Sequence, residues 1–167
     1  MKLNSLNDLF EDKLNDLYGA EMKTADLLPK IAEACSSNEI KDALKEHILQ
    51  SRNQVSRLEQ AFSNLNIKPK IKENPVIDAL IDKCNEMLNS SGNPDVLNAG
   101  LIAVEQGIEH YEISAYGTAR AWASTLGFTD IADQLQATLN EEKYTDEKLS
   151  KIAEKGYGGE AVNKKAA

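Results

Sequence analysis

Apolar side chains recur at alternating spacings of three and four residues along most of this 167-residue chain, and this period constrains the fold more than any other feature. In the first segment the stripe includes Phe10, Leu14, Leu28 and Ile31. Three later segments carry equivalent stripes. The nine Gly and four Pro are too few to end the many short strands of a β-sandwich. The period therefore predicts long amphipathic helices and an all-α fold.

Helix-capping signals divide the chain into four long helices and one short helix. We expect them over residues 5–35, 36–64, 75–89, 94–126 and 129–155. Pro29 lies inside the first of these helices and predicts a kink or a short break there. The residues that carry the capping signals are Ser5 with Asp8, Ser36 with Glu39, Asn74 before Pro75, Asn93 before Pro94, Gly127, Thr129 and Gly156.

The lengths of the connections predict how these helices pack. Short links join the two helices of each long pair, which makes them antiparallel neighbours. The connection over residues 65–93 is long enough to cross the bundle and carries the short helix. This order is that of a ferritin-like antiparallel four-helix bundle with a long crossover between its second and third helices. The bundle would occupy residues 1–156, and residues 157–167 would form a flexible C-terminal tail with little to bury.

The two helical pairs also resemble each other in sequence. A shift of 91 residues places Glu21 on Glu112 and Leu44 on Leu135. We therefore expect two similar hairpins related by a pseudo-two-fold axis.

Charge and cysteine content exclude several classes of function. The chain has 19 basic and 27 acidic residues, a net charge of −8, whereas nucleic-acid binding requires a basic surface. No stretch approaches the ~18 apolar residues of a membrane span. Cys35 and Cys84 lack metal-ligand spacing and lie among apolar helical positions, which favours buried free thiols. We expect a cytoplasmic protein with no nucleic-acid or membrane partner.

Acidic residues interrupt the apolar stripes at positions that belong to the core. Counting outward from the two hairpins brings Glu21, Glu112 and Glu142 to one layer near the middle of the bundle. Glu109 lies one turn before Glu112 and reaches that layer from its edge, while Glu105 lies two turns away. Unpaired carboxylates in an apolar interior cost several kcal/mol, and the stripes contain no Lys or Arg to pair with them. This pattern predicts a metal site.

Two residues of the second helix complete the candidate site. His47 faces inward about a turn and a half from the acidic layer, and Gln50 lies between them on the flank of the stripe. Each position also has a structural interpretation. A lone inward histidine is typical of a hydrogen-bonded core residue, and an inward glutamate can extend its carboxylate to solvent.

Several segments resemble the YciE/YciF-type bacterial ferritin-like family. They are residues 17–21, 108–113, 116–121 and 139–146, which read LYGAE, IEHYEI, YGTARA and LNEEKYTD. The resemblance covers about residues 6–153 and implies a ferritin-like bundle, a homodimer and a link to bacterial stress responses. The pair formed by Glu109 and Glu112 is also similar to the third-helix motif of rubrerythrins, which helps to hold a di-iron centre.

The sequence departs from the di-iron carboxylate pattern in the second and fourth long helices. A full site has a Glu-x-x-His pair on each of two helices, but here Thr145 follows Glu142 and Gln54 follows Ser51 at that spacing. Relatives often carry glutamate where this chain has Gln50. The resulting oxygen-rich site would hold Fe or Mn, would favour Mn, Mg or Ca more than a standard di-iron set does, or would be empty.

Two functional hypotheses follow, and neither assigns a catalytic residue. The first is a metal-binding protein of oxidant or metal stress, whose Fe or Mn ions react with peroxide or oxygen. The second is a non-catalytic dimeric scaffold with a degenerate or empty metal site. A DNA-protecting mini-ferritin shell is disfavoured because the chain is acidic and lacks a basic N-terminal arm.

Overall fold

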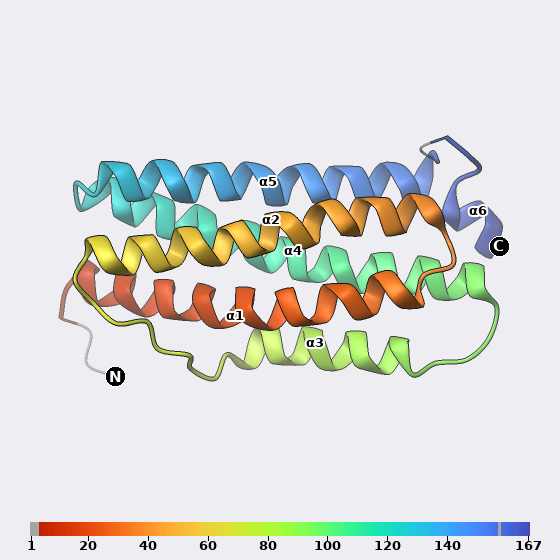
Figure 1. Cartoon of the computed structure of the whole chain (residues 1–167), viewed down its shortest axis with the longest axis horizontal. Helices are drawn as coiled ribbons and strands as arrows, with labels where there is room; N and C mark the ends of the chain where they lie inside the picture. The colour runs from red at the N-terminus through yellow and green to blue at the C-terminus, as the bar shows by residue number, and fades with distance from the viewer. Residues whose placement is uncertain (1–3, 157) are drawn as a thin grey trace.

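The computed structural model describes residues 4–156 and 158–167, and all regular structure in these residues is helical (Figure 1). Tyr157, which the sequence analysis assigned to the tail, lies outside the described residues, as do residues 1–3. The helices are α1 (Leu6–Ala34), α2 (Asn38–Asn64), α3 (Pro75–Leu88), α4 (Pro94–Thr125), α5 (Thr129–Glu154) and α6 (Val162–Ala166).

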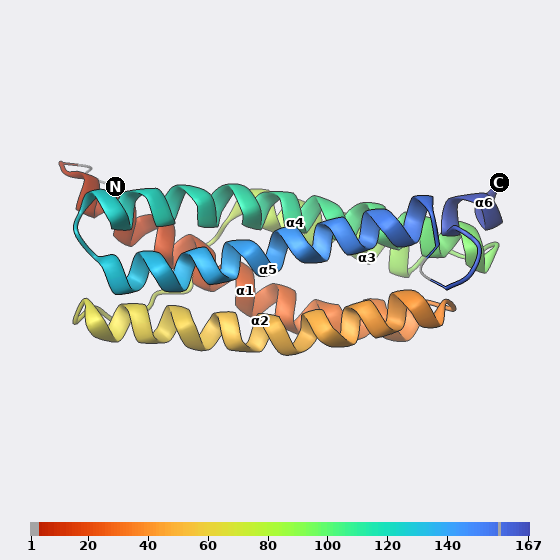
Figure 2. The ribbon, with the colours of Figure 1, turned by 90° about the horizontal axis from the view of Figure 1, so that it is seen from above.

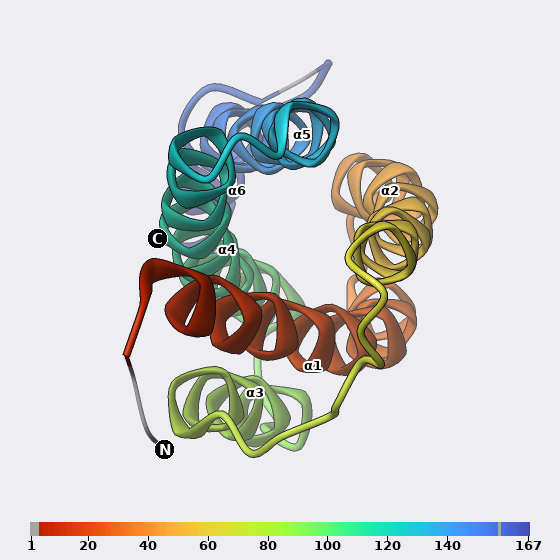
Figure 3. The same cartoon turned by 90° about the vertical axis from the view of Figure 1, so that its left-hand side faces the viewer.

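The four long helices form the antiparallel bundle that the sequence predicts. Seen from the end, α1, α2, α5 and α4 surround a common centre (Figure 3). Helices α1 and α2 form one hairpin and α4 and α5 the other, while α2 packs against α5 and α1 against α4 (Figure 2). The crossover continues into α3, which lies outside the ring against α1 and α4. The predicted all-α bundle with its extra crossover helix is confirmed.

Local capping explains most of the helix boundaries. Ser5 and Asp8 form the predicted reciprocal capping box at the start of α1. Asn74 and Asn93 cap α3 and α4 through their side chains, each followed by proline in the first turn. Gly127 adopts a φ of 81° after α4, a left-handed conformation that glycine reaches without strain.

Two local predictions differ from the structure. The predicted capping box at Ser36 is wrong: Ser37 precedes α2 and makes no side-chain cap bond. The backbone N–H of Ser36 donates to Asn98 Oδ1 (3.0 Å), and Asn98 Nδ2 donates to Ser36 Oγ (2.8 Å). Phe128, rather than Thr129, is the N-cap residue of α5. Helix α1 continues through Pro29 without a break, so a kink is the alternative that stays a prediction at this residue.

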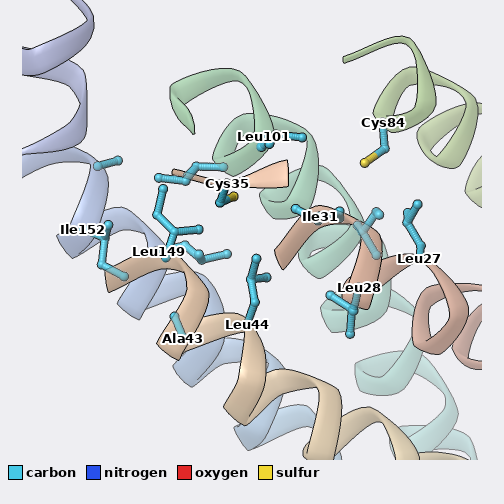
Figure 4. Close-up of a cluster of buried hydrophobic side chains, with 14 of the residues drawn as sticks. Leu27, Leu28, Ile31, Cys35, Ala43, Leu44, Cys84, Leu101, Leu149 and Ile152 are labelled. Atoms are coloured by element: carbon cyan, nitrogen blue, oxygen red, sulfur yellow. The ribbon is translucent and has the colours of Figure 1, made fainter. Parts of the chain in front are cut away.

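Two apolar clusters fill the bundle, and polar residues lie between them on every long helix. Figure 4 shows one cluster, which includes Leu28, Leu44, Leu101 and Leu149. The other includes Leu17 on α1, Leu58 on α2, Ala115 on α4 and Leu139 on α5. Within α1, for example, Glu21 falls between Leu17 and Leu28. The two clusters thus enclose a polar layer in the middle of the bundle.

The C-terminal segment buries more than the sequence analysis expected. Helix α6 packs against α4 and α5 at the end of the bundle where α4 begins (Figure 1). Ala161 and Val162 are both buried, with Val162 joining the apolar cluster of Figure 4. Cys35 and Cys84 are buried free thiols, as predicted. Among the described helices, none has the length and apolar character needed to cross a membrane.

Candidate metal site

Four buried side chains from three helices converge in the polar layer. His47 comes from α2, Glu109 and Glu112 from α4, and Glu142 from α5. Each residue offers one potential ligand atom, and these four atoms lie within 4.8 Å of one another. Three carboxylates and one imidazole at this separation could hold a metal ion. We call these four residues the cation group.

The helical period explains why α4 contributes two ligands. Glu109 and Glu112 are three residues apart, so their side chains lie on one face of α4, one turn from each other. The apolar residues Ile108 and Ala115 of the same helix are buried on either side of them. Packing of these neighbours holds the two carboxylates inside the bundle.

The imidazole of His47 is oriented by a carboxylate outside the cation group. Its Nδ1 lies 3.1 Å from Glu105 Oε1 in hydrogen-bond geometry, and 3.1 Å from Glu109 Oε1. Donation from Nδ1 to Glu105 leaves the lone pair on Nε2, which lies 3.6 Å from Glu142 Oε2. Histidine ligands commonly donate their second ring N–H to a carboxylate in this way. Glu105 is therefore suited to orienting His47 rather than to joining the group.

Every member of the cation group has a buried polar atom without a hydrogen-bond partner in the described part of the chain. These atoms are His47 Nε2, both carboxylate oxygens of Glu109, Glu112 Oε2 and Glu142 Oε2. Buried polar atoms are almost always hydrogen-bonded, so such a concentration requires an explanation. A cation among these lone pairs provides one, and the residues present therefore fit a metal ion.

Glu21 lies in the same layer but is held by hydrogen bonds instead. Ser51 Oγ donates to its Oε2 (3.0 Å), and the hydroxyl of the buried Tyr116 donates to its Oε1 (2.5 Å). The structure therefore buries Glu21, as the sequence predicts, but does not bring it into the cation group. Its hydroxyl partners come from α2 and α4, and the sequence analysis did not anticipate the hydrogen bond from Tyr116.

The amide of α2 that reaches the site is Gln54, not the predicted Gln50. Gln50 is half-buried and accepts a hydrogen bond from Thr145 Oγ1 (3.4 Å) at the junction of α2 and α5. Gln54 is buried, and its Nε2 donates to Glu142 Oε1 and to Glu141 Oε2, the latter at 3.1 Å. A signal for Gln54 was present, because it belongs to the same apolar stripe as His47.

His47 is closer to the acids than its register suggests. Its register in the sequence predicts a position about a turn and a half from the layer of Glu112. In the structure it joins the cation group because Glu109, one turn before Glu112, extends the acidic layer toward it. Long side chains let a site extend over more than one helical turn. A register that counts only the heights of the Cα atoms therefore underestimates which residues can meet.

Burial and mutual repulsion control the protonation of the site. Burial raises the pKa of Glu112 well above its usual range, and the charges of Glu21 and Glu142 raise it further. Burial likewise raises the pKa of Glu109. For His47, burial opposes the charged form, but the carboxylates of Glu109 and its neighbours outweigh it and raise the pKa well above 6.5. Without a cation, the site therefore retains protons that a cation would displace.

The pKa of Glu21 is also raised. Burial, reinforced by the charge of Glu142, raises the pKa of Glu21 to about 8, although the hydrogen bonds from Tyr116 and Ser51 act in the opposite direction.

Comparison with known proteins identifies the family. Residues 5–167 match DUF892, described as a domain of unknown function. The chain is also 36% identical over 165 residues to the protein YciF of Escherichia coli strain K12, which covers 98% of this chain and 99% of that protein. The chain belongs to the YciE/YciF-type family.

Solved structures share the fold of this chain. The crystal structure of the Escherichia coli stress protein YciF matches with a TM-score of 0.86 and 35% identity, covering 90% of this chain and 95% of that chain. YcfI from Rhodopseudomonas palustris matches with a TM-score of 0.87 and 37% identity, covering 91% and 97%. A protein from Xanthomonas campestris pv. campestris, at 16% identity and a TM-score of 0.70 over 88% and 89%, shows the shared fold alone.

Proposed function

We propose that this protein binds a divalent cation, Fe or Mn, in the cation group and acts in the handling of metal or oxidants during bacterial stress. The supporting observation is that each of the four residues places at one point a buried polar atom that has no hydrogen-bond partner among residues 4–156 and 158–167. The relative YciF, titled a stress protein, supports the physiological setting. The proposal includes a cytoplasmic homodimer without a nucleic-acid or membrane partner.

The chemistry of the donors favours this class of cation. Three carboxylates and one imidazole provide hard oxygen ligands and one nitrogen, a set suited to Mn and Fe, while Mg and Ca prefer oxygen alone. A bound Fe or Mn ion would supply electron transfer to peroxide or oxygen. The chain itself holds the ion through Glu109, Glu112 and Glu142, orients His47 through Glu105, and excludes water by burial of the whole layer.

The second candidate is a helical scaffold whose metal site is degenerate. This alternative is favoured because His47 and Gln54 compensate part of the negative charge of the buried carboxylates. His47 faces the carboxylates within 3.6 Å, and its raised pKa favours the imidazolium form without a cation. The Gln54 amide also donates to Glu142. In this alternative Glu109 and Glu112 are protonated or bridged by water, and the long helices serve as a dimer surface.

Substitution of Glu142 distinguishes the two candidates. E142Q removes one ligand charge with little change in shape, and E147Q is the matched control, because Glu147 lies on the same helix with its side chain exposed and paired with Lys151. Chelator-treated protein would be titrated with Mn²⁺ and, under anaerobic conditions, with Fe²⁺ by calorimetry, and metal content would be measured by elemental analysis.

A metal-binding protein gives a definite result in this experiment. The unsubstituted chain and E147Q bind with equal affinity, whereas E142Q weakens binding by about 100-fold or more because the cation loses a charged ligand. Bound Mn would give anomalous scattering between His47 and Glu142. A chain that takes up neither ion, and that E142Q stabilises against urea by relieving buried repulsion, would support the scaffold and reject the metal function.

A further inference from the structure

The buried oxygen of Gln54 has no hydrogen-bond partner among the described residues, although the other end of the same amide is well bonded. Gln54 is only 1% exposed. Its Nε2 donates to Glu142 and Glu141, but its Oε1 has no partner. A buried amide oxygen without a hydrogen-bond partner is destabilising, so its retention beside the Glu142 carboxylate calls for a function.

The surroundings of Gln54 hold the side chain at the edge of the cation group. Glu141 Oε2 accepts from Gln54 Nε2 at 3.1 Å, and the Glu141 carboxylate receives two hydrogen bonds from Arg57, at 2.6 and 2.8 Å. Arg57 also donates to Thr138 Oγ1 (3.1 Å). The partly exposed ion pair between Arg57 and Glu141 joins α2 to α5, and Glu141 connects it to Gln54. The amide is therefore placed between an outer ion pair and the inner ligand Glu142.

We propose that Gln54 is a neutral metal ligand that exchanges the two ends of its amide. A glutamine amide has nearly the same shape after a half-turn about its terminal bond, which exchanges donor and acceptor. In the metal-free protein Nε2 faces Glu142 and supplies a positive dipole end. In the loaded protein Oε1 faces the cation, since a carbonyl oxygen is a favourable ligand for Mn and similar ions. This assignment rests on the proposed function.

The exchange would give α2 two neutral ligands, His47 and Gln54, against the three carboxylates of α4 and α5. The two residues are seven positions apart, so they lie on one face of the helix. A neutral fifth ligand raises the coordination number without adding a fourth negative charge to the buried layer. A glutamine at position 54 thus limits the repulsion among the buried carboxylates in the metal-free protein.

Gln50 supplies a matched control for this assignment. It is the same residue type one turn earlier on the same helix, but it is half-buried and its oxygen accepts from Thr145 rather than lacking a partner. The test compares Q54L and Q54E with Q50L and Q50E. Each variant would be titrated with Mn²⁺ by calorimetry, and its urea midpoint would be measured with and without Mn²⁺.

The two Gln54 variants are expected to change the Mn²⁺ affinity in opposite directions. Q54L weakens Mn²⁺ binding about tenfold, whereas Q54E strengthens it about tenfold by adding charge. Without metal, Q54E lowers the urea midpoint because it adds a carboxylate beside Glu142, and Mn²⁺ restores it. Both Gln50 variants bind Mn²⁺ like the unsubstituted chain.

Each alternative outcome has a distinct meaning. If the unsubstituted chain binds Mn²⁺ and Q54L and Q54E bind it equally well, Gln54 is not a ligand and the proposed function survives. If the unsubstituted chain binds no ion but Q54E does, the proposed function is wrong while the placement of residue 54 at the site is supported. If no variant binds an ion, both proposals are overturned.

Discussion

The two hairpins of this bundle present equivalent positions to its centre, but they fill them with different chemistry. Glu21 and Glu112 are 91 residues apart, as are Ser51 and Glu142, so the two pairs correspond. In the first hairpin Ser51 donates a hydrogen bond to Glu21 (3.0 Å). In the second hairpin the corresponding residues are both carboxylates that belong to the cation group. At equivalent positions, the first hairpin therefore pairs Glu21 with a hydroxyl group, whereas the second hairpin places the two carboxylates Glu112 and Glu142 close together.

This difference teaches that burial of a carboxylate alone does not identify a ligand. Glu21 and Glu112 are equally buried. Both oxygens of Glu21 accept hydrogen bonds, whereas Glu112 accepts one from Thr24 Oγ1 (3.1 Å) and keeps Oε2 without a described partner. The buried oxygen without a partner, not the buried charge, distinguishes Glu112, which belongs to the cation group, from Glu21, which does not.

The largest expected effect comes from exchanging each acid of this pair for its amide. E112Q should weaken Mn²⁺ binding by about 100-fold or more, since it removes a charged ligand. E21Q should change it by less than about fivefold, because its carboxylate is already held by Ser51 and Tyr116. Calorimetric titration of the two variants measures both values. Equal losses would show that Glu21 is a ligand and that the two hairpins are functionally symmetric.

The fold was predictable because its signals are local. The three-and-four apolar period and the caps at Ser5, Asn74 and Asn93 depend on neighbours within one helical turn. The predicted cap at Ser36 was wrong because its hydroxyl bonds to Asn98, which is 62 residues away. Competition from a distant partner leaves no trace in the local pattern.

The site was predictable only in part, for the same reason. A glutamate in an apolar stripe is conspicuous because its burial is costly, which pointed to Glu109, Glu112 and Glu142. A neutral amide in a stripe is far less conspicuous, so the sequence marks Gln54 only as the residue that stands where a di-iron set has histidine, and not as a candidate ligand. The role proposed for Gln54 depends on its contacts with Glu141 and Glu142 of another helix, and no spacing within α2 encodes these contacts.

The next effect is a loss of stability of the metal-free protein as pH rises. The pKa of Glu21 is raised to about 8 in the folded chain, and the carboxyls of Glu109 and Glu112 are raised in the same direction. Because their folded pKa values exceed the unfolded value of 4.5, the folded state binds more protons. The stabilising contribution of Glu21 is complete below about pH 4.5 and is lost as pH rises through about 8. Glu109 and Glu112 contribute in the same direction, because their pKa values are also raised in the folded state.

Urea midpoints measured with a chelator across this pH range test the expectation, and a parallel series with saturating Mn²⁺ is the control. Bound cation replaces the protons, so the saturated protein should keep its midpoint at the alkaline end. A metal-free midpoint that rises between pH 5 and pH 8 would mean that the buried acids are already compensated within the chain.

The smallest expected effect is a difference in stability between variants that remove the hydroxyl partner of Glu21 and variants that remove the hydroxyl partner of Glu112. S51A removes the hydrogen bond to Glu21 Oε2 and should lower the free energy of unfolding by about 1–3 kcal/mol, because it leaves a buried carboxylate oxygen without its donor. T24V removes the corresponding bond to Glu112 Oε1. In Mn²⁺-saturated protein its cost should fall below that of S51A, since the cation then compensates the charge of Glu112 but leaves Glu21 dependent on its hydroxyls. Urea unfolding of both variants, with and without Mn²⁺, measures the difference. If Mn²⁺ relieves S51A as fully as T24V, the cation compensates both acids alike and the distinction between the two hairpins fails.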